Sequence, residues 1–217
     1  MDIAFLLFEG MTALDAVGPY EILQRVPGSN VRFVAKERGE QRAEDNSLGL
    51  VADYSFKDDV PADVLLVPGG LATRQLVNDE ETLEWIRQMD QKSEWTTAVC
   101  TGSLLLAATG LLKGREATTH WLEMEMLGEL GAKPVEERVV HDGKFVTGAG
   151  VTAGIDMAIT LVALMHDDFV AQALQLAVEY DPQPPFASGS PRTARRELVD
   201  LVREMAASRS LHSATRL

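Results

Sequence analysis

Short runs rich in Val, Ile, Leu and Phe alternate along this chain with longer stretches whose apolar residues recur at helical spacing. Strands that helices cover on both faces are buried on both faces, so their sequences are almost continuously apolar. Regular alternation of such strands with helices is typical of βαβ units around a parallel sheet. The pattern therefore predicts a doubly wound α/β sandwich with a mostly parallel central sheet.

The expected strands and helices follow one another from the N-terminus. Strands are expected near residues 3–8, 31–36, 63–67, 96–99, 116–118 and 145–147. Helices are expected at about residues 13–26, 80–92, 103–109, 122–130, 153–165 and 170–178. In such folds ligands bind beyond the carboxyl ends of the strands, so the turns that follow the strands are the places to search for a site.

The periodic pattern stops near residue 180. Residues 181–191 are rich in proline, which lacks a backbone donor, and they read as an extended connector. Residues 193–208 carry apolar side chains at helical spacing and predict one terminal helix. A single helix does not make a domain, so residues 1–217 are expected to form one domain with a C-terminal helical extension.

Charge and cysteine content exclude several classes of protein. The net charge of −13 repels phosphate backbones and anionic lipids, so neither nucleic acid nor membrane is an expected partner. The apolar run at the N-terminus ends at Glu9 and has no basic flank, so it is too short for a signal peptide or a membrane span. Together with a single cysteine, these features favour a cytoplasmic location.

That cysteine, Cys100, stands at the end of an expected strand. Residues 95–99 lead directly into Cys100, Thr101 and Gly102, and a helix-forming run follows. This is the sequence of a nucleophile elbow, a sharp strand-to-helix turn that presents a reactive side chain. A buried structural cysteine is the alternative, but strand, glycine turn and helix together favour the nucleophile. The start of the following helix is expected to lower the thiol pKa.

A second glycine turn, Gly69 and Gly70, follows another buried run. Glycines at the end of a strand leave backbone N–H groups free to face a ligand. The N–H groups of Gly70 and Thr101 are therefore candidates for stabilising negative charge that develops on a substrate. Taken alone, this segment is equally consistent with an ordinary turn.

Asp15 and His120 are the candidate groups for moving protons. Asp15 lies among apolar residues, where burial raises the pKa of a carboxyl group, so it can hold a proton and donate it. Its alternative role is that of a helix N-cap. His120 follows an expected strand and could act as a base towards a cysteine, although a capping or packing role is favoured. The other histidines have no partners at ligand spacing, so no metal site is predicted.

At these residues the chain resembles the ThiJ/PfpI superfamily of glutamine amidotransferase-like proteins, and within it the isocyanide hydratases. The matching segments are residues 5–8, 14–19, 67–70, 99–103, 117–121 and 147–156. Many members have Glu and His where this chain has Asp15 and Thr101, and the combination found here is the hydratase pattern. The resemblance implies a flavodoxin-like homodimer with its active sites close to the subunit interface.

The resemblance also implies a reaction. Cys100 would attack the terminal carbon of an isocyanide, Asp15 would deliver a proton, and water would release a formamide from a covalent thioimidate. Thr101 would hold Asp15 and the water. The expected substrate-binding residues are Gly69, Gly70, Gly150, Val151 and His120.

Two alternatives to this reaction stay open. The first is another cysteine-dependent hydrolase or a glyoxalase-like enzyme in which His120 moves the proton. The second is a non-catalytic redox or ligand sensor like the sensor domain of AraC-type regulators, although only about one helix follows the core. The sequence contains no phosphate-binding fingerprint and no metal cluster, so no cofactor is expected.

Overall fold

The structure is a computed structural model that describes the backbone of residues 1–214 and the side chains of residues 1–208. The chain divides into two compact units, Met1–Glu179 and Tyr180–Leu217. The first unit, called the α/β unit below, contains the sheet and every predicted site residue. Within residues 1–214 no helix combines the length and the hydropathy that crossing a membrane requires.

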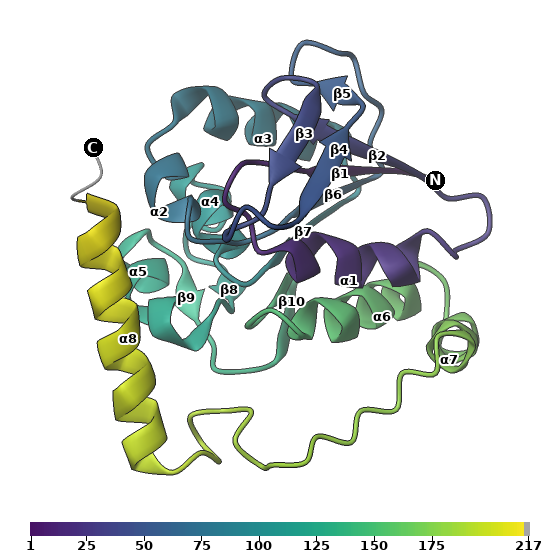
Figure 1. Cartoon of the computed structure of the whole chain (residues 1–217). Coiled ribbons are helices and arrows are strands. Elements are labelled where there is room, and N and C mark those ends of the chain that lie inside the picture. Colours follow the sequence, from purple (N-terminus) through teal and green to yellow (C-terminus); the bar gives the residue numbers. More distant parts are fainter. Residues whose placement is uncertain (215–217) are drawn as a thin grey trace. The chain divides into compact units, whose positions relative to one another are not determined.

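A seven-stranded sheet with the order β10-β11-β7-β6-β1-β2-β5 runs through the α/β unit (Figure 1). Its strands are β1 (Asp2–Leu6), β2 (Asn30–Ala35), β5 (Tyr54–Ser55), β6 (Val64–Val67), β7 (Trp95–Val99), β10 (Val139–Asp142) and β11 (Phe145–Gly148). All neighbouring pairs are parallel except β10 and β11. The sequence-based prediction of a mostly parallel flavodoxin-like α/β fold is confirmed.

The strand order changes direction at β1. The chain passes from β1 to β2 on one side and from β6 to β7 on the other. Crossovers between parallel strands are right-handed in nearly all proteins, so the helices that make these two crossovers are expected to cover opposite faces of the sheet. The two crossovers start from the neighbouring strands β1 and β6. In open α/β sheets, ligands bind beyond the carboxyl ends of the strands at such a point.

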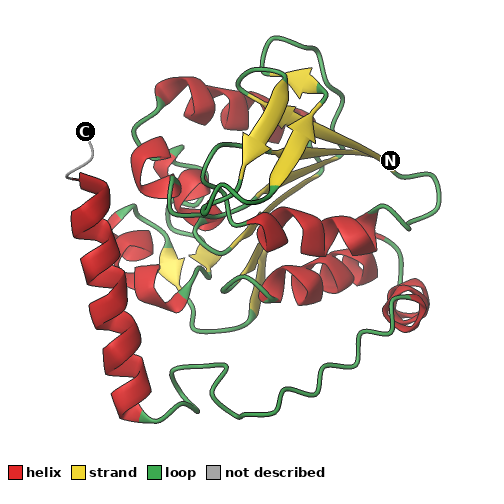
Figure 2. Ribbon diagram, viewed as in Figure 1, coloured by secondary structure: helices red, strands yellow, loops and turns green. Residues whose placement is uncertain are grey.

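Helices on both faces complete the α/β unit (Figure 2). They are α1 (Ala13–Leu23), α2 (Thr73–Leu76), α3 (Glu80–Lys92), α4 (Gly102–Ala108), α5 (Met124–Glu129), α6 (Ala153–Met165) and α7 (Asp168–Ala177). α1 packs against α6, and α3 packs against α4. These helices and the sheet enclose a core of aliphatic and aromatic side chains that includes Phe5, Leu66 and Leu104, none of which is exposed to solvent.

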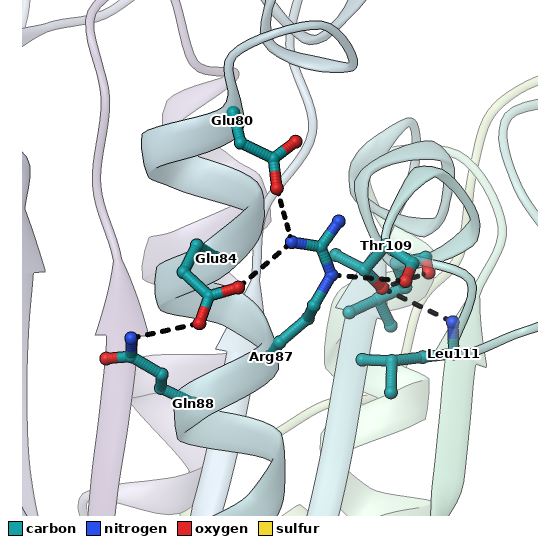
Figure 3. A network of polar contacts seen from close by, with 7 residues as sticks. Glu80, Glu84, Arg87, Gln88, Thr109 and Leu111 are labelled. Atoms are coloured by element: carbon teal, nitrogen blue, oxygen red, sulfur yellow. Dashed lines mark hydrogen bonds and ion pairs between the residues drawn. The ribbon is translucent and has the colours of Figure 1, made fainter.

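Arg87 of α3 holds the end of α4 (Figure 3). Its Nη1 donates to Glu80 Oε1 at 2.7 Å and to Glu84 Oε2 at 3.1 Å, and its Nε donates to the carbonyl of Thr109 at 3.3 Å. Exposed ion pairs contribute little to stability. The bond to Thr109 satisfies a carbonyl at the helix terminus, which has no partner within the helix. The network therefore anchors the far end of the helix that begins beside Cys100.

Several short strands differ from the sequence-based expectation. A hairpin of β3 (Gly39–Arg42) and β4 (Gly49–Ala52) was not predicted, because Gly39, Glu40, Gln41 and Arg42 include no apolar residue. The strand expected near residues 116–118 is β8 (Glu116–Ala117), which pairs with β9 (Lys133–Pro134) outside the main sheet. The helix expected at residues 122–130 begins as a 3-10 turn, Trp121–Glu123, before α5.

The second unit contains α8 (Arg196–Ala214), preceded by a segment without helix or strand from residue 180. α8 begins three residues after the predicted start at residue 193 and extends past the predicted end at residue 208. A C-terminal helical extension is therefore present. The organisation of the chain as one domain stays a prediction.

Candidate functional site

Cys100 occupies a sharp turn between β7 and α4. Its φ of 56° lies in the left-handed region, which a residue with a side chain rarely adopts. The turn is held because the backbone N–H of Cys100 donates to the carbonyls of Gly148 and Ala149, at 3.0 and 2.8 Å. Strained residues of this kind cluster at active sites. The strand, turn and helix of the predicted elbow are all present.

Two glycines let the elbow approach the end of β6. A Cβ on Gly102 would lie 2.2 Å from the carbonyl oxygen of Val67. A Cβ on Gly69 would lie 2.6 Å from the backbone nitrogen of Thr101 and 2.9 Å from Asp15 Oδ2. No side chain fits at either place, so the close packing of these turns around Asp15 requires glycine at both positions.

Thr101 binds Gly70 rather than Asp15. Its Oγ1 accepts a hydrogen bond from the Gly70 N–H at 2.9 Å and donates to the Gly70 carbonyl at 3.2 Å. Two sequence-based expectations are therefore wrong for this arrangement. The Gly70 N–H does not face a substrate, because Thr101 occupies it, and the Thr101 hydroxyl holds the turn that carries Gly69 instead of holding the acid directly.

Asp15 is fully buried on α1. Its Oδ2 accepts a hydrogen bond from the Gly69 N–H at 2.9 Å, while its Oδ1 has no hydrogen-bond partner of ordinary geometry among the described residues. Burial raises the pKa of Asp15 to about 7, against the lowering effects of the Gly69 N–H and the Cys100 thiol. The capping position of α1 belongs to Thr12. Asp15 is therefore a buried proton-exchanging group and not a helix cap.

The thiol of Cys100 is 5% exposed. Burial and the charge of Asp15 raise its pKa to about 12, although the backbone N–H groups of Val151 and Thr101 donate to the sulfur and oppose the shift. The prediction of a lowered thiol pKa is wrong, because desolvation outweighs the partial charge at the start of a short helix. In the resting protein the sulfur holds its proton, and a base is needed to remove it.

The loop after β11 closes another side of the site. The N–H of Val151 reaches the Cys100 sulfur, and Gly150 lies against the ring of His120, where a Cβ would approach Cδ2 to 2.9 Å. The hydroxyl of Thr119 donates to the Cys100 carbonyl at 2.8 Å and so fixes the segment before His120 to the elbow. Gly150 and Val151 thus lie beside His120 and Cys100, and their role in binding a substrate stays a prediction.

His120 itself is a capping residue. Its Nδ1 accepts a hydrogen bond from the Leu122 N–H at 3.4 Å at the start of the 3-10 turn. Burial lowers the pKa of His120, so the ring is neutral at pH 7. Within the described side chains no hydrogen bond joins it to Cys100. The capping alternative accounts for this residue better than the role of base.

Glu44 is a site residue that the sequence did not reveal. It lies between β3 and β4, and its Oε1 accepts hydrogen bonds from the Thr12 hydroxyl at 2.7 Å and from the Leu71 N–H at 3.1 Å. Its charge contributes to the raised pKa of Asp15. The local sequence around Glu44 is charged and aperiodic, so only the packing of the hairpin against Met11 brings it to the site.

The described side chains, those of the site included, contain no cluster of three or more His, Cys, Asp or Glu residues placed to hold a metal ion. The groups available for chemistry are therefore a thiol and a carboxyl group in contact, together with backbone donors. This combination suits nucleophilic catalysis with an attached proton carrier.

Comparison with known proteins identifies the class. A model of the DJ-1/PfpI family matches residues 1–164, and the chain belongs to this family. The resemblance read from the sequence is thus confirmed.

The similar proteins include an enzyme, a protein of solved structure and a transcriptional regulator. An isonitrile hydratase of Pseudomonas putida is 45% identical over 207 residues, which span 95% of this chain and 90% of that protein. The structure of a ThiJ/PfpI family protein from Pseudomonas syringae superposes with a TM-score of 0.91 at 39% identity, over 95% of this chain and 86% of that one. The HTH-type transcriptional regulator CdhR of Pseudomonas aeruginosa is 28% identical over 97% of this chain and 62% of its own length.

Proposed function

We propose that this protein is an enzyme that hydrates isonitriles (isocyanides), R–N≡C, to N-substituted formamides. The observation that carries the proposal is the contact between the Cys100 thiol and the buried carboxyl group of Asp15, whose Oδ1 has no hydrogen-bond partner of ordinary geometry among the described residues. The 45% identity to an isonitrile hydratase over most of both chains supports this choice of substrate.

The first step joins sulfur to carbon. Above about pH 7 the pair holds one proton, which rests on Cys100 while Asp15 is ionised. As the sulfur attacks the terminal carbon of the isonitrile, Asp15 accepts the thiol proton and passes it to the same carbon. The N–H groups of Thr101 and Val151 stabilise the negative charge that develops on sulfur during the transfer. The product is a thioimidate, R–N=CH–S–Cys100, in which all atoms of substrate and thiol are retained.

The second step releases the formamide. Water adds to the thioimidate carbon, and Asp15 takes one proton from the water and delivers it to the nitrogen. The adduct R–NH–CH(OH)–S then collapses, the C–S bond breaks, and a proton returns to sulfur. Water and isonitrile are consumed in equal amounts, and neither an oxidant nor a cofactor is required.

Turnover is the direct test of this proposal. Purified protein should convert an alkyl isonitrile such as cyclohexyl isocyanide to the formamide, followed by NMR, while C100A should not. Mass spectrometry of quenched wild-type protein should show an adduct equal to the mass of the isonitrile on Cys100. A protein that binds the isonitrile without forming the formamide would contradict the proposal.

The oligomeric state, the location in the cell and two alternative functions also belong to this proposal. The homodimer and the cytoplasmic location stay predictions. A hydrolase that uses His120 as base is disfavoured, because the acceptor nitrogen of that neutral ring, Nδ1, already accepts the Leu122 N–H, and within the described side chains no hydrogen bond joins the ring to Cys100. A ligand sensor without turnover stays the second candidate, since this chain matches 62% of the length of a transcriptional regulator.

A further inference from the structure

Three segments that are far apart in the sequence meet at Glu44. The Gly10 N–H donates to the Arg42 carbonyl at 2.8 Å, and the Glu44 N–H donates to the Met11 carbonyl at 3.1 Å. The Glu44 carboxylate then accepts from Thr12 and Leu71, at 2.7 and 3.1 Å. A single side chain therefore connects the turn after β1, the turn after β6 and the β3–β4 hairpin.

Glu44 binds Thr12 and Leu71, and both of these residues lie next to groups that determine the protonation state of Asp15. Thr12 occupies the N-cap position of α1, three residues before Asp15, and Leu71 follows the turn whose Gly69 N–H donates to Asp15 Oδ2. The Thr12 N–H also donates to the Gly69 carbonyl at 2.9 Å. Movement of either turn would change the distance between Asp15 and its only hydrogen-bond donor of ordinary geometry among the described residues.

We propose that Glu44 is a positioning residue for Asp15: it ties the turn of Gly69 to the start of α1, and its fixed negative charge makes Asp15 a stronger proton acceptor. The consequence for the reaction rests on the proposed function. A carboxylate takes a proton from a thiol more readily when its own affinity for protons is higher, and Glu44 is held at a constant place by two hydrogen bonds.

Among the described residues, few titratable groups other than Glu44 influence the pKa of Asp15. The elbow contributes the Cys100 thiol, and the turn after β6 contributes only backbone groups to Asp15. On α6, which packs against α1, Asp156 is paired with Arg138 at 2.6 Å. Glu44 is exposed and raises the pKa of Asp15 as a like charge does.

Three variants separate the two parts of this role. E44Q keeps an acceptor oxygen for Thr12 and Leu71 but removes the charge, whereas E44A removes both. E40Q is the matched control, because Glu40 lies on the same hairpin and pairs with Arg42 instead of contacting the site.

The first measurement needs no isonitrile. The rate at which iodoacetamide alkylates Cys100 should rise with pH and level off as Asp15 ionises, because the charged carboxylate opposes further loss of the thiol proton. In E44Q the levelling should occur at lower pH, and in E40Q it should stay in place. D15N should lack it, and D15N/E44Q should match D15N. Superposed profiles of E44Q and wild type would overturn the proposal.

The second measurement is isonitrile hydration. E44A should lose on the order of tenfold to a hundredfold in kcat, because misplaced reacting groups cost that much. E44Q should recover part of this loss, and an E44A protein with the full kcat would contradict the positioning role. A wild-type protein that hydrates no isonitrile but shows the alkylation shift in E44Q would refute the proposed function and support the role of Glu44.

Discussion

Two buried aspartates of the α/β unit have opposite surroundings. Asp90 of α3, which is 7% exposed, accepts a hydrogen bond from the Thr96 hydroxyl at 2.6 Å and pairs with Lys144 Nζ at 2.9 Å. Asp15 of α1 is not exposed at all and contacts a thiol instead of a cation, and its Oδ1 has no hydrogen-bond partner of ordinary geometry in the part of the chain that the structure describes. The same side chain is thus neutralised at one place and left uncompensated at the other.

The difference teaches how to distinguish a structural carboxylate from a reactive one. A buried charge costs free energy unless a counter-ion and hydrogen bonds compensate it. Asp90 has both, and it joins α3 to β7 and to the start of β11. Asp15 lacks a cation, so its pKa rises to about 7 and its proton is exchangeable at physiological pH. A buried carboxyl group without a compensating charge, at the end of the sheet, therefore marks the candidate reactive group of this fold.

Replacing the thiol should have the largest effect. C100A should lower hydration by on the order of 10³-fold or more, because the covalent route is lost entirely. The fold should persist, since the removed group is small, and circular dichroism would verify this. Hydration by C100A at a substantial share of the wild-type rate would show that the reaction does not need the contact between Cys100 and Asp15.

Asp15 should reduce stability in a pH-dependent way. Its pKa is about 7 in the folded protein and near the ordinary value of 3.8 when unfolded, so the folded state binds the extra proton between these values. The contribution of Asp15 to stability is therefore most favourable below about pH 4 and is lost as pH rises to about 7. Relative to wild type, D15N should gain up to about 4 kcal/mol in unfolding free energy across this window. Urea unfolding at a series of pH values would measure it, and parallel curves for the two proteins would contradict it.

Replacements of the two aspartates should differ in their effect on activity. D15N keeps the shape of the side chain but cannot carry the proton, so hydration should fall on the order of a hundredfold. D90N should stay within a few-fold of wild type, because Asp90 lies away from the thiol on α3. Equal losses in the two variants would mean that the comparison reflects folding rather than chemistry.

Asp90 should matter mainly for stability. D90N leaves Lys144 without its carboxylate and weakens the bond to Thr96, which should cost about 2 kcal/mol after allowance for the partial exposure of Lys144. Thermal unfolding at one pH would record the loss. An unchanged unfolding temperature would show that the ion pair is not a stabilising contact.

The pH dependence of hydration should show the smallest effect. Only the ionised form of Asp15 can accept the thiol proton, so kcat/KM should rise through about pH 7 and level above it. Below that pH the rate should fall by about tenfold per unit. D15N should have no inflection there, and a wild-type profile that falls as pH rises through 7 would assign the resting proton to Asp15 instead of Cys100.

Much of the fold and the list of site residues could be predicted from the sequence alone. Local patterns determine the strands around Phe5, Leu66 and Ala98, because strands buried on both faces must be apolar along their length. The elbow at Cys100 and the turn at Gly69 are also local, since a strand, a glycine and a helix start follow one another directly. The positions of Cys100 and Gly69 at the ends of strands were therefore recognisable from the sequence, and their roles in the reaction stay predictions.

Only the tertiary structure decided what those residues do. The pKa of Cys100 depends on how deeply the thiol is buried and on the nearness of Asp15, and neither follows from a sequence pattern, so the lowered pKa expected at a helix start was wrong. The same holds for the hydroxyl of Thr101, which binds Gly70, and for Glu44, which a hairpin without apolar periodicity brings to the site. Desolvation and hydrogen bonding depend on neighbours that are distant in the chain, whereas secondary structure depends largely on adjacent residues.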